Sequence, residues 1–379
     1  MRFEILTGLR ALLLMWVMFV HLPSDAVPGF LTEPHTKWRF GVDFFLAISG
    51  FLVTRSLLQD APQSSSLAAR AMTVRRYLER RVARVFPAYY VMLAVIGVAA
   101  FALRGGLLEH LREIAPILPS FPLFFANYTI PAMGDKVPHP LLILWSMSFQ
   151  EQFYLLLAAF YFAGGNRLGR WLLAASLGSV ACRFFMAFGP WAVGEHRAYY
   201  EGWLHLNFDA IGWGCLAWLA REPLSRLWAT RTRVWIVNSL LLVAIYAVIV
   251  IPGHFPGNEQ VFVVNQALKA IFFALGIVAV SELENSKGLF ARALKSTLAR
   301  RVGNAAFEVY LVHVFIYGLV QKAPFLKGVV ALPALYGVSI LVGVVFYERF
   351  SLPVQGRLKK WMRGLGVKTP AVGATVSAS

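Results

Sequence analysis

The chain has 379 residues, of which 58% are hydrophobic and 14% aromatic, with a mean hydropathy of +0.61 and a formal net charge of +17. The apolar share exceeds the roughly 45–50% of an ordinary soluble domain, which excludes a typical soluble fold and indicates a membrane protein. Most of the 36 Lys and Arg lie in the segments that connect the apolar stretches, and they gather in every second one of these segments. The charge therefore follows the positive-inside rule and does not indicate a nucleic-acid partner.

Apolar stretches of about 20 residues, the length that crosses a bilayer as a helix, recur along the chain. We predict an all-α, polytopic protein of the inner (plasma) membrane, with about ten transmembrane helices and both termini cytoplasmic. Residues 1–350 are predicted to form one membrane domain, and residues 351–379 a basic cytoplasmic tail that is partly disordered. The predicted helices are 8–23, 40–58, 86–104, 141–163, 170–188, 203–220, 234–252, 261–281, 302–321 and 328–348.

The first predicted helix carries Arg10 and His21. An interval of eleven residues places both on one helix face, with a rise of about 16 Å between them. Ionisable groups inside a membrane are costly and often functional, so one face would present a fixed cation near the cytoplasm and an imidazole near the outer side. The alternative is that Arg10 reaches the headgroups and His21 lies in the outer interface.

The second predicted helix begins with "GVDFFLAISG", which places Asp43 at a depth similar to that of His21. A carboxylate that orients an imidazole is the usual support for a general base, and we therefore predict a His21–Asp43 dyad. The alternative is that Asp43 caps its own helix by accepting hydrogen bonds from backbone N–H groups.

The third predicted helix opens with "RRYLERRVARVFPAYY". Its arginines recur at intervals of four residues and form one stripe, which could hold a polyphosphate through charge-assisted hydrogen bonds. The alternative is that these arginines anchor the helix to anionic lipid, and the residues alone favour this alternative. The stripe consists of Arg76, Arg80 and Arg84, with Arg81 beside it.

Further ionisable and polar side chains lie inside the later predicted helices. An interior this polar exceeds what a purely structural bundle needs, and it indicates either transport or catalysis within the membrane. The two cysteines, both in predicted helices, indicate neither a disulfide framework nor a metal site. The polar residues are Gln150, Glu151, Asp209, Glu308 and His313, and the cysteines are Cys182 and Cys215.

Six segments in this order resemble the acyltransferase-3 family of integral membrane acyltransferases over essentially the whole chain. They are "LTGLRALLLMWVMFVHL", "GVDFFLAISGFLVTRSL", "RRVARVFPAYY", "LWSMSFQEQFY", "FDAIGWGCLA" and "VYLVH". The resemblance implies transfer of an acyl group, usually acetyl from cytoplasmic acetyl-CoA, to a hydroxyl of a cell-surface glycan or glycolipid.

The resemblance also implies roles for individual residues. Arg10 and His21 match the essential pair of the family, and Asp43 matches its conserved acid. The basic cluster of the family corresponds to Arg80, Arg81 and Arg84. Gln150 stands where the family usually has a glutamate, whereas Glu151 is retained, and Asn207 stands where it often has an arginine.

The resulting hypothesis gives His21, Asp43 and Glu151 catalytic roles. The arginines at positions 10, 80, 81 and 84 would bind the phosphates of acetyl-CoA or another acyl-CoA. No metal is predicted, and the expected partners are acyl-CoA, a glycan or glycolipid acceptor and the lipid bilayer. The first alternative is a secondary transporter of an anionic or glycolipid substrate, although the sequence shows no pair of similar halves. The second alternative is a non-catalytic relative that acts by binding.

Overall fold

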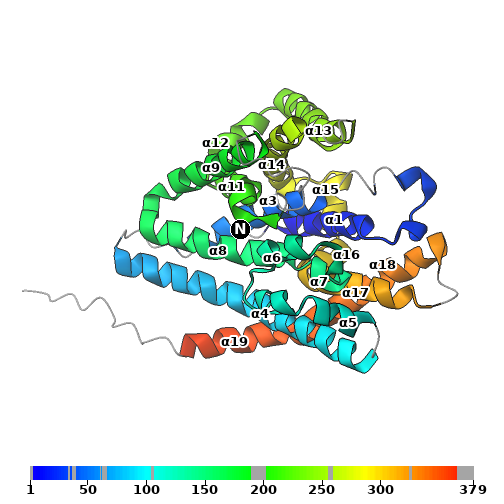
Figure 1. Cartoon of the computed structure of the whole chain (residues 1–379). Helices are drawn as coiled ribbons and strands as arrows, with labels where there is room; N and C mark the ends of the chain where they lie inside the picture. Colours follow the sequence, from blue (N-terminus) through cyan, green and yellow to red (C-terminus); the bar gives the residue numbers. More distant parts are fainter. Residues whose placement is uncertain are drawn as a thin grey trace, which may run out of the picture.

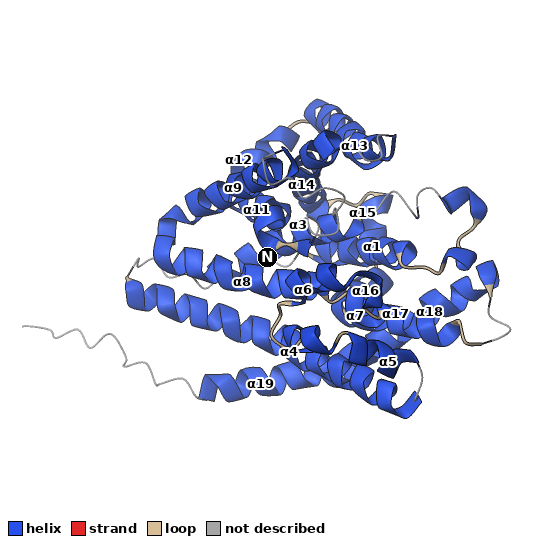
Figure 2. Cartoon of the chain, in the orientation of Figure 1, coloured by secondary structure: helices blue, strands red, loops and turns tan. Residues whose placement is uncertain are grey.

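The computed structural model describes residues 3–32, 35, 40–59, 61, 66–103, 106–188, 202–254, 259–323 and 327–364. Throughout these ranges the regular elements are helices, and none of the described residues forms a strand (Figure 2). The prediction of an all-α fold is confirmed.

The helices pack into a single bundle (Figure 1). Helix α13 lies at one edge of the bundle and α19 at the opposite edge, beside α4. The helices are α1 (Glu4–Val20), α3 (Gly41–Leu58), α4 (Leu67–Leu103), α5 (Gly106–Glu113), α6 (Ala126–Met133), α7 (His139–Leu142), α8 (Trp145–Gly164), α9 (Leu168–Phe188), α11 (Leu204–Leu219), α12 (Arg221–Ser225), α13 (Arg231–His254), α14 (Glu259–Glu282), α15 (Leu289–Leu294), α16 (Thr297–Asn304), α17 (Ala306–Val320), α18 (Leu332–Phe346) and α19 (Leu352–Gly364).

Six helical stretches of the described residues are long and apolar enough to cross a membrane, or seven if the bent pair α16–α17 counts as one span. The predicted number of ten is therefore not confirmed. Helices α1 and α11 have only 17 and 16 residues. The predicted helices 141–163 and 170–188 lie within one of the six stretches, because α8 and α9 follow each other with only the turn at Gly165–Arg167 between them.

Helix α4 begins much earlier than predicted, at Leu67 instead of residue 86. The charged run that precedes residue 86 is helical as well, and the bundle buries several of its side chains. Tyr77 and Ala83, for example, are fully buried against neighbouring helices. Pro87 lies inside the helix without ending it. The arginines of this segment are thus held on a rigid element.

The predicted helix 302–321 is two helices, α16 and α17, which meet at Ala305 with a bend of 74°. Helix α16 lies against α1 at a very close distance, since a Cβ atom on Gly303 would lie only 1.9 Å from the carbonyl oxygen of Thr7. A similar close approach joins α3 and α11, where a Cβ atom on Gly50 would lie 2.1 Å from the carbonyl oxygen of Ile211. Small residues at these crossings let the backbones touch, as is common in membrane bundles.

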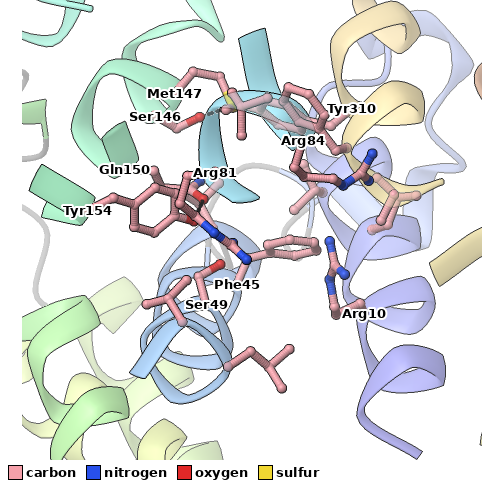
Figure 3. Close-up of a pocket in the computed structure, with 18 residues that line it drawn as sticks. Arg10, Phe45, Ser49, Arg81, Arg84, Ser146, Met147, Gln150, Tyr154 and Tyr310 are labelled. Atoms are coloured by element: carbon pink, nitrogen blue, oxygen red, sulfur yellow. Dashed lines mark hydrogen bonds between the residues drawn. The ribbon is translucent and has the colours of Figure 1, made fainter. Parts of the chain in front are cut away.

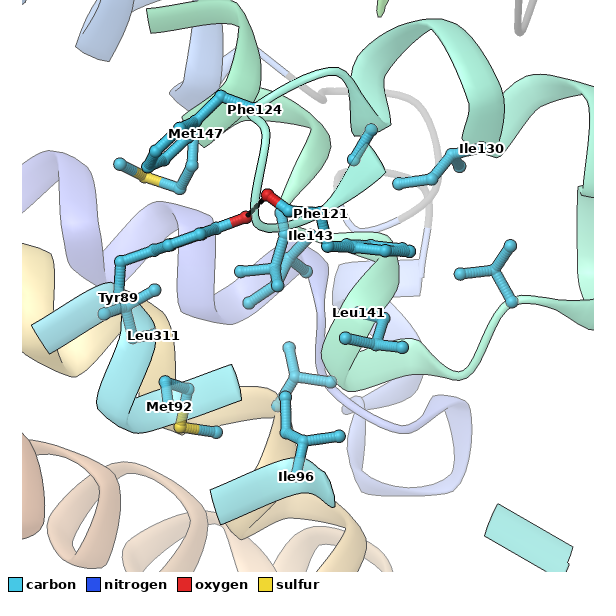
Figure 4. Packing of buried hydrophobic residues seen from close by; sticks show 14 of the residues in the cluster. Tyr89, Met92, Ile96, Phe121, Phe124, Ile130, Leu141, Ile143, Met147 and Leu311 are labelled. Atoms are coloured by element: carbon cyan, nitrogen blue, oxygen red, sulfur yellow. Dashed lines mark hydrogen bonds between the residues drawn. The ribbon is translucent and has the colours of Figure 1, made fainter. Parts of the chain in front are cut away.

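A cluster of buried apolar side chains fixes the apolar half of α4 against α17 and against the segment between α5 and α8 (Figure 4). At its centre the Tyr89 hydroxyl donates a hydrogen bond of 2.8 Å to the carbonyl oxygen of Phe121. This bond satisfies the polar end of a fully buried tyrosine, which would otherwise be costly in an apolar core. The cluster holds in place three of the helices that form the site described below.

The helix that begins with α18 continues past residue 350. A π-helical turn, Tyr347–Ser351, leads directly into α19, which packs along α4. Residues 365–379, the last part of the predicted tail, lie outside the described residues. The division of the chain at residue 350 stays a prediction.

Candidate functional site

A cavity of about 270 Å³ lies inside the bundle between α1, α3, α4, α8 and α17 (Figure 3). Arginine side chains from α1 and α4 point into it, and most of the remaining surface is apolar or aromatic. The lining residues are Arg10, Leu14, Val17, Val42, Phe45, Ser49, Leu52, Val53, Arg81, Arg84, Val85, Ser146, Met147, Gln150, Tyr154, Ala306, Phe307 and Tyr310.

Two of the arginines face the cavity without an ion pair within the described part of the chain. The guanidinium of Arg10 lies 5.6 Å from the ring centre of Phe45. The guanidinium of Arg81 lies between two aromatic rings, 5.8 Å from the centre of Tyr77 and 5.7 Å from that of Tyr154. Such cation–π contacts hold a guanidinium in place while leaving its N–H donors available. The cavity therefore presents donors suited to an anion.

The third arginine, Arg84, is bound to the broken helix. Its two terminal nitrogens lie 2.6 and 3.1 Å from the carboxylate oxygens of Glu308, and Nη2 also donates to the carbonyl oxygen of Asn304 at 3.0 Å. Glu308 is fully buried in the first turn of α17, and Asn304 is the last residue of α16. Arg84 thus joins both sides of the bend while its side chain lines the cavity.

Arg80 does not line the cavity, although it was predicted to act with Arg81 and Arg84. Its side chain turns to α3, where Nη2 donates to the carbonyl oxygen of Ser56 at 2.5 Å and Nε donates to the Ser56 hydroxyl at 3.3 Å. One helical position separates Arg80 from Arg81, and the resulting rotation of about 100° directs the two side chains to different neighbours. The predicted basic cluster is thereby divided.

His21 ends α1 and lies beside a second histidine, His313 of α17. The Nδ1 atom of His21 is 2.8 Å from the carbonyl oxygen of Val17 and 3.3 Å from Nε2 of His313. The Nδ1 atom of His313 is in turn 2.6 Å from the carbonyl oxygen of Tyr310. Val17 and Tyr310 both line the cavity, so the histidine pair lies about one helical turn beyond it.

The predicted pairing of His21 with Asp43 is wrong in this structure. The Asp43 carboxylate accepts a hydrogen bond of 2.6 Å from the ammonium group of Lys269 on α14, and no hydrogen bond joins Asp43 to His21 among the described residues. Asp43 pairs with Lys269 because a lysine inside the bundle needs an anionic partner. A catalytic part for Asp43 itself stays a prediction.

Glu151 is buried behind the cavity rather than on its wall. Only 7% of its surface is exposed, and its Oε1 atom has no hydrogen-bond partner within the described residues. The adjacent Gln150 does line the cavity, and its side-chain oxygen accepts a hydrogen bond of 3.0 Å from the Tyr154 hydroxyl. Gln150, which stands where the family usually has a glutamate, therefore faces the cavity, whereas the retained Glu151 does not.

Asp209, for which the sequence suggested no role, is paired with a buried arginine of α9. The Arg183 guanidinium lies 3.0 and 2.8 Å from the two carboxylate oxygens, and it also donates to the carbonyl oxygen of Leu206. That carbonyl precedes Asn207, where α11 departs from helical geometry. Arg183 thus pairs with the buried Asp209 carboxylate and also donates to the Leu206 carbonyl oxygen next to the kink. Polar groups inside a membrane bundle need such partners.

Two aromatic residues of the site escaped the sequence analysis, Tyr154 and Tyr310. The Tyr310 hydroxyl makes 2.8 Å hydrogen bonds with the Ser146 hydroxyl and the Ile143 carbonyl oxygen, and together they close one wall of the cavity. The signal that could have found Tyr310 is its position three residues before His313, which puts both on one helix face. Among the described residues no group of three or more His, Cys, Asp or Glu could hold a metal ion.

Comparison with known proteins identifies the family. A sequence model described as an acyltransferase domain matches residues 3–348, which is nearly the whole chain. The chain belongs to this acyltransferase-3 family. Its apolar helices and its membership of this family make it a multi-pass membrane protein.

Curated relatives of this chain carry names that refer to O-acetyl transfer. The chain is 27% identical over 317 residues to the peptidoglycan O-acetyltransferase OatA of Listeria monocytogenes, covering 81% of this chain and 48% of the relative. It is 23% identical over 318 residues to the O-acetyltransferase OatA of Staphylococcus aureus, covering 81% and 49%. The chain thus spans about half the length of these relatives. No solved structure matches it with significance.

Proposed function

We propose that this protein is an O-acyltransferase of the inner (plasma) membrane that moves an acetyl group from cytoplasmic acetyl-CoA, or another acyl group from its CoA ester, to a hydroxyl of a cell-surface glycan or glycolipid. The observation that carries the proposal is the cavity that Arg10, Arg81 and Arg84 line within a member of an acyltransferase family. Peptidoglycan is the first acceptor to test, because a relative is named a peptidoglycan O-acetyltransferase.

The charges of the cavity support an anionic donor. Arg10 and Arg81 lie inside the bundle without carboxylate partners among the described residues, and a buried cation that lacks an anionic partner is costly. A diphosphate offers oxygens that can accept paired hydrogen bonds from such guanidinium groups. We assign Arg10 and Arg81 to the donor phosphates. Arg84 is a third cation of the cavity, and it also forms an ion pair with Glu308.

The apolar lining supports a flexible, largely uncharged arm above the phosphates. Leu14 and Val17 follow Arg10 on α1, and Val85 follows Arg84 on α4. An arm that lies along these side chains would bring its thioester toward Val17 and Tyr310, whose carbonyl oxygens accept hydrogen bonds from His21 and His313. The reacting carbonyl would then lie close to an imidazole.

The proposed chemical step uses His21 as the base. Nε2 of His21 removes the proton from an acceptor hydroxyl, and the oxygen attacks the thioester carbonyl, forming the new C–O bond. The C–S bond then breaks, and the departing thiolate takes the proton from the imidazolium to give free CoA and the O-acyl product. Glu151 is proposed to act in the same site, next to Gln150 of the cavity wall, and its buried Oε1 atom has no hydrogen-bond partner among the described residues.

The direct test is acyl transfer by the purified full chain in nanodiscs, supplied with radiolabelled acetyl-CoA and soluble peptidoglycan fragments. We expect label on the glycan with the wild-type protein, and a loss of at least about a hundredfold with His21→Ala, which is the usual contribution of a general base. Arg10→Ala and Arg81→Ala are expected to raise the KM for acetyl-CoA.

The matched control is Arg75→Ala, which removes an arginine from the same helix as Arg81. Arg75 is half exposed and pairs with Glu79, so its loss is expected to leave transfer unchanged. Absence of any acyl transfer by the wild-type protein, together with uptake of a labelled anion in proteoliposomes, would overturn the proposal in favour of a transporter.

A further inference from the structure

We infer that His313 is a positioning residue that, together with the Val17 carbonyl oxygen, holds His21 in one tautomer and ring orientation, so that a second histidine takes the place usually held by a carboxylate. The inference rests on the proposed function, because it assigns a role within the same acyl transfer. It rests on the direct contact between the two imidazoles, whose ring centres are 5.1 Å apart.

The position of each proton follows from the hydrogen-bond partners. A carbonyl oxygen can only accept, so Nδ1 of His313, which is 2.6 Å from the Tyr310 carbonyl oxygen, must carry a proton. In the neutral ring Nε2 of His313 is then an acceptor. The same argument protonates Nδ1 of His21, which lies 2.8 Å from the Val17 carbonyl oxygen and faces the acceptor nitrogen of His313 at 3.3 Å.

This arrangement leaves the basic lone pair of neutral His21 on Nε2. When Nε2 takes a proton from the acceptor hydroxyl, the positive charge is shared with Nδ1–H, which is already directed at two acceptors. Both hydrogen bonds become charge-assisted and therefore stronger at that moment. A preorganised acceptor that gains strength as charge develops lowers the barrier of the step.

The surroundings of His313 are suited to holding one ring orientation. The residue is fully buried, and Tyr310 and Tyr317 lie against its ring with centre-to-centre distances of 5.5 Å each. The Tyr317 hydroxyl donates to the Met18 carbonyl oxygen on α1, which keeps α17 beside the end of that helix. Asp43, the residue expected to orient His21, is instead bound to Lys269.

Two amide variants separate the two hydrogen bonds of His313. The side chain of His313→Asn ends near the position of Nδ1, so it can still donate to Tyr310 but cannot reach His21. The side chain of His313→Gln ends near the position of Nε2, where its oxygen can accept from His21. Both variants are compared with the wild type in nanodiscs with acetyl-CoA and soluble peptidoglycan fragments.

We expect His313→Asn to lower kcat about ten- to a hundredfold with little change in the KM for acetyl-CoA, and His313→Gln to recover most of that loss. The matched control is Tyr336→Phe, which removes a hydrogen bond to the Met15 carbonyl of α1 without touching His21, and it should retain kcat. In a His21→Ala background, His313→Asn should cause no further loss.

The inference is overturned if His313→Asn keeps wild-type kcat, or if the Asn and Gln variants lose it equally. Either result would leave the proposed function standing, because the wild-type protein would still transfer the acyl group. A wild-type protein that transfers nothing would instead refute the proposed function, and the role of His313 with it.

Discussion

The carboxylate of Asp43 lies 2.6 Å from the ammonium group of Lys269, which ties α3 to α14. Both side chains are largely buried, with 24% and 12% of their surfaces exposed. A charge pair in this position stabilises the bundle only as long as both partners are present, because either one alone would be an uncompensated charge.

We therefore predict that Lys269→Met lowers the free energy of unfolding by about 2 kcal/mol, the usual scale for a hydrogen bond to a charged group. The double variant Asp43→Asn/Lys269→Met should recover part of this loss, as measured by thermal unfolding in nanodiscs. In the transfer assay Asp43→Asn should retain more activity than His21→Ala. Complete loss of transfer by Asp43→Asn at an unchanged unfolding temperature would instead support a catalytic Asp43.

Arg84 and Glu308 allow a structural and a binding role to be separated. Arg84→Met leaves the fully buried Glu308 without its partner, and we expect a loss of about 3–5 kcal/mol in stability. Arg84→Met/Glu308→Gln should fold better than the single variant, since the unpaired carboxylate is gone, yet should still bind acetyl-CoA more weakly than wild type. Thermal unfolding and the KM for acetyl-CoA report the two effects. A double variant with wild-type KM would show that Arg84 serves only the helix bend.

We predict that Glu151 lowers the unfolding temperature of the protein but is needed for acyl transfer. Its Oε1 atom is buried without a hydrogen-bond partner among the described residues, and Glu151→Gln replaces this carboxyl group with an amide of nearly the same volume. We expect an equal or higher unfolding temperature and a loss of transfer of at least about tenfold, as at other sites where activity requires a destabilised group.

The adjacent Gln152 provides the contrasting control. It donates to the Phe124 carbonyl oxygen at 2.6 Å and to Asn127 at 2.8 Å, outside the cavity. Gln152→Met should lower the unfolding temperature while each folded molecule keeps its kcat. Equal transfer by Glu151→Gln and wild type would remove Glu151 from the mechanism.

The contact between α1 and α16 predicts a large effect from one methyl group. A Cβ atom on Gly303 would lie 1.9 Å from the Thr7 carbonyl oxygen, so Gly303→Ala must push the helices apart, and we expect a loss of about 1–3 kcal/mol or more. Gly97→Ala on α4 meets nothing within 4 Å and should be neutral or stabilising. Equal unfolding temperatures for the two variants would contradict this packing.

Hydropathy predicted most of the helices because each spans enough apolar residues to stand out from its neighbours. It placed α3 within one residue at its start, since the apolar run there is bounded by polar residues on both sides. It misplaced the start of α4, because a helix face buried at Tyr77 and Ala83 is masked by the arginines between them. No proline marks the bend at Ala305, and Arg84, which donates to the Asn304 carbonyl oxygen beside it, lies more than two hundred positions away in the sequence.

The sequence indicated which charges lie in the membrane but not how they pair. Arg183, Lys269, Asp43 and Asp209 all lie within the predicted helices, where a charged side chain needs a partner. Their pairing depends on which helices are neighbours, and that is decided by packing contacts such as those of Gly50 and Gly214 between α3 and α11. For the same reason the sequence could single out both His21 and His313 but could not predict that they are neighbours.

The length of α4 bears on how two aqueous compartments could share one reaction. At 1.5 Å per residue its 37 residues extend for about 55 Å, whereas the hydrocarbon core of a bilayer is about 30 Å thick. The apolar half from Val85 onward can fill that core, and the arginine-bearing half then stands among and beyond the lipid headgroups. A highly charged donor would insert only its thioester end into the hydrocarbon layer, and a bulky glycan would not have to enter it. The bilayer would remain sealed to both substrates while a group of only a few atoms passes between them.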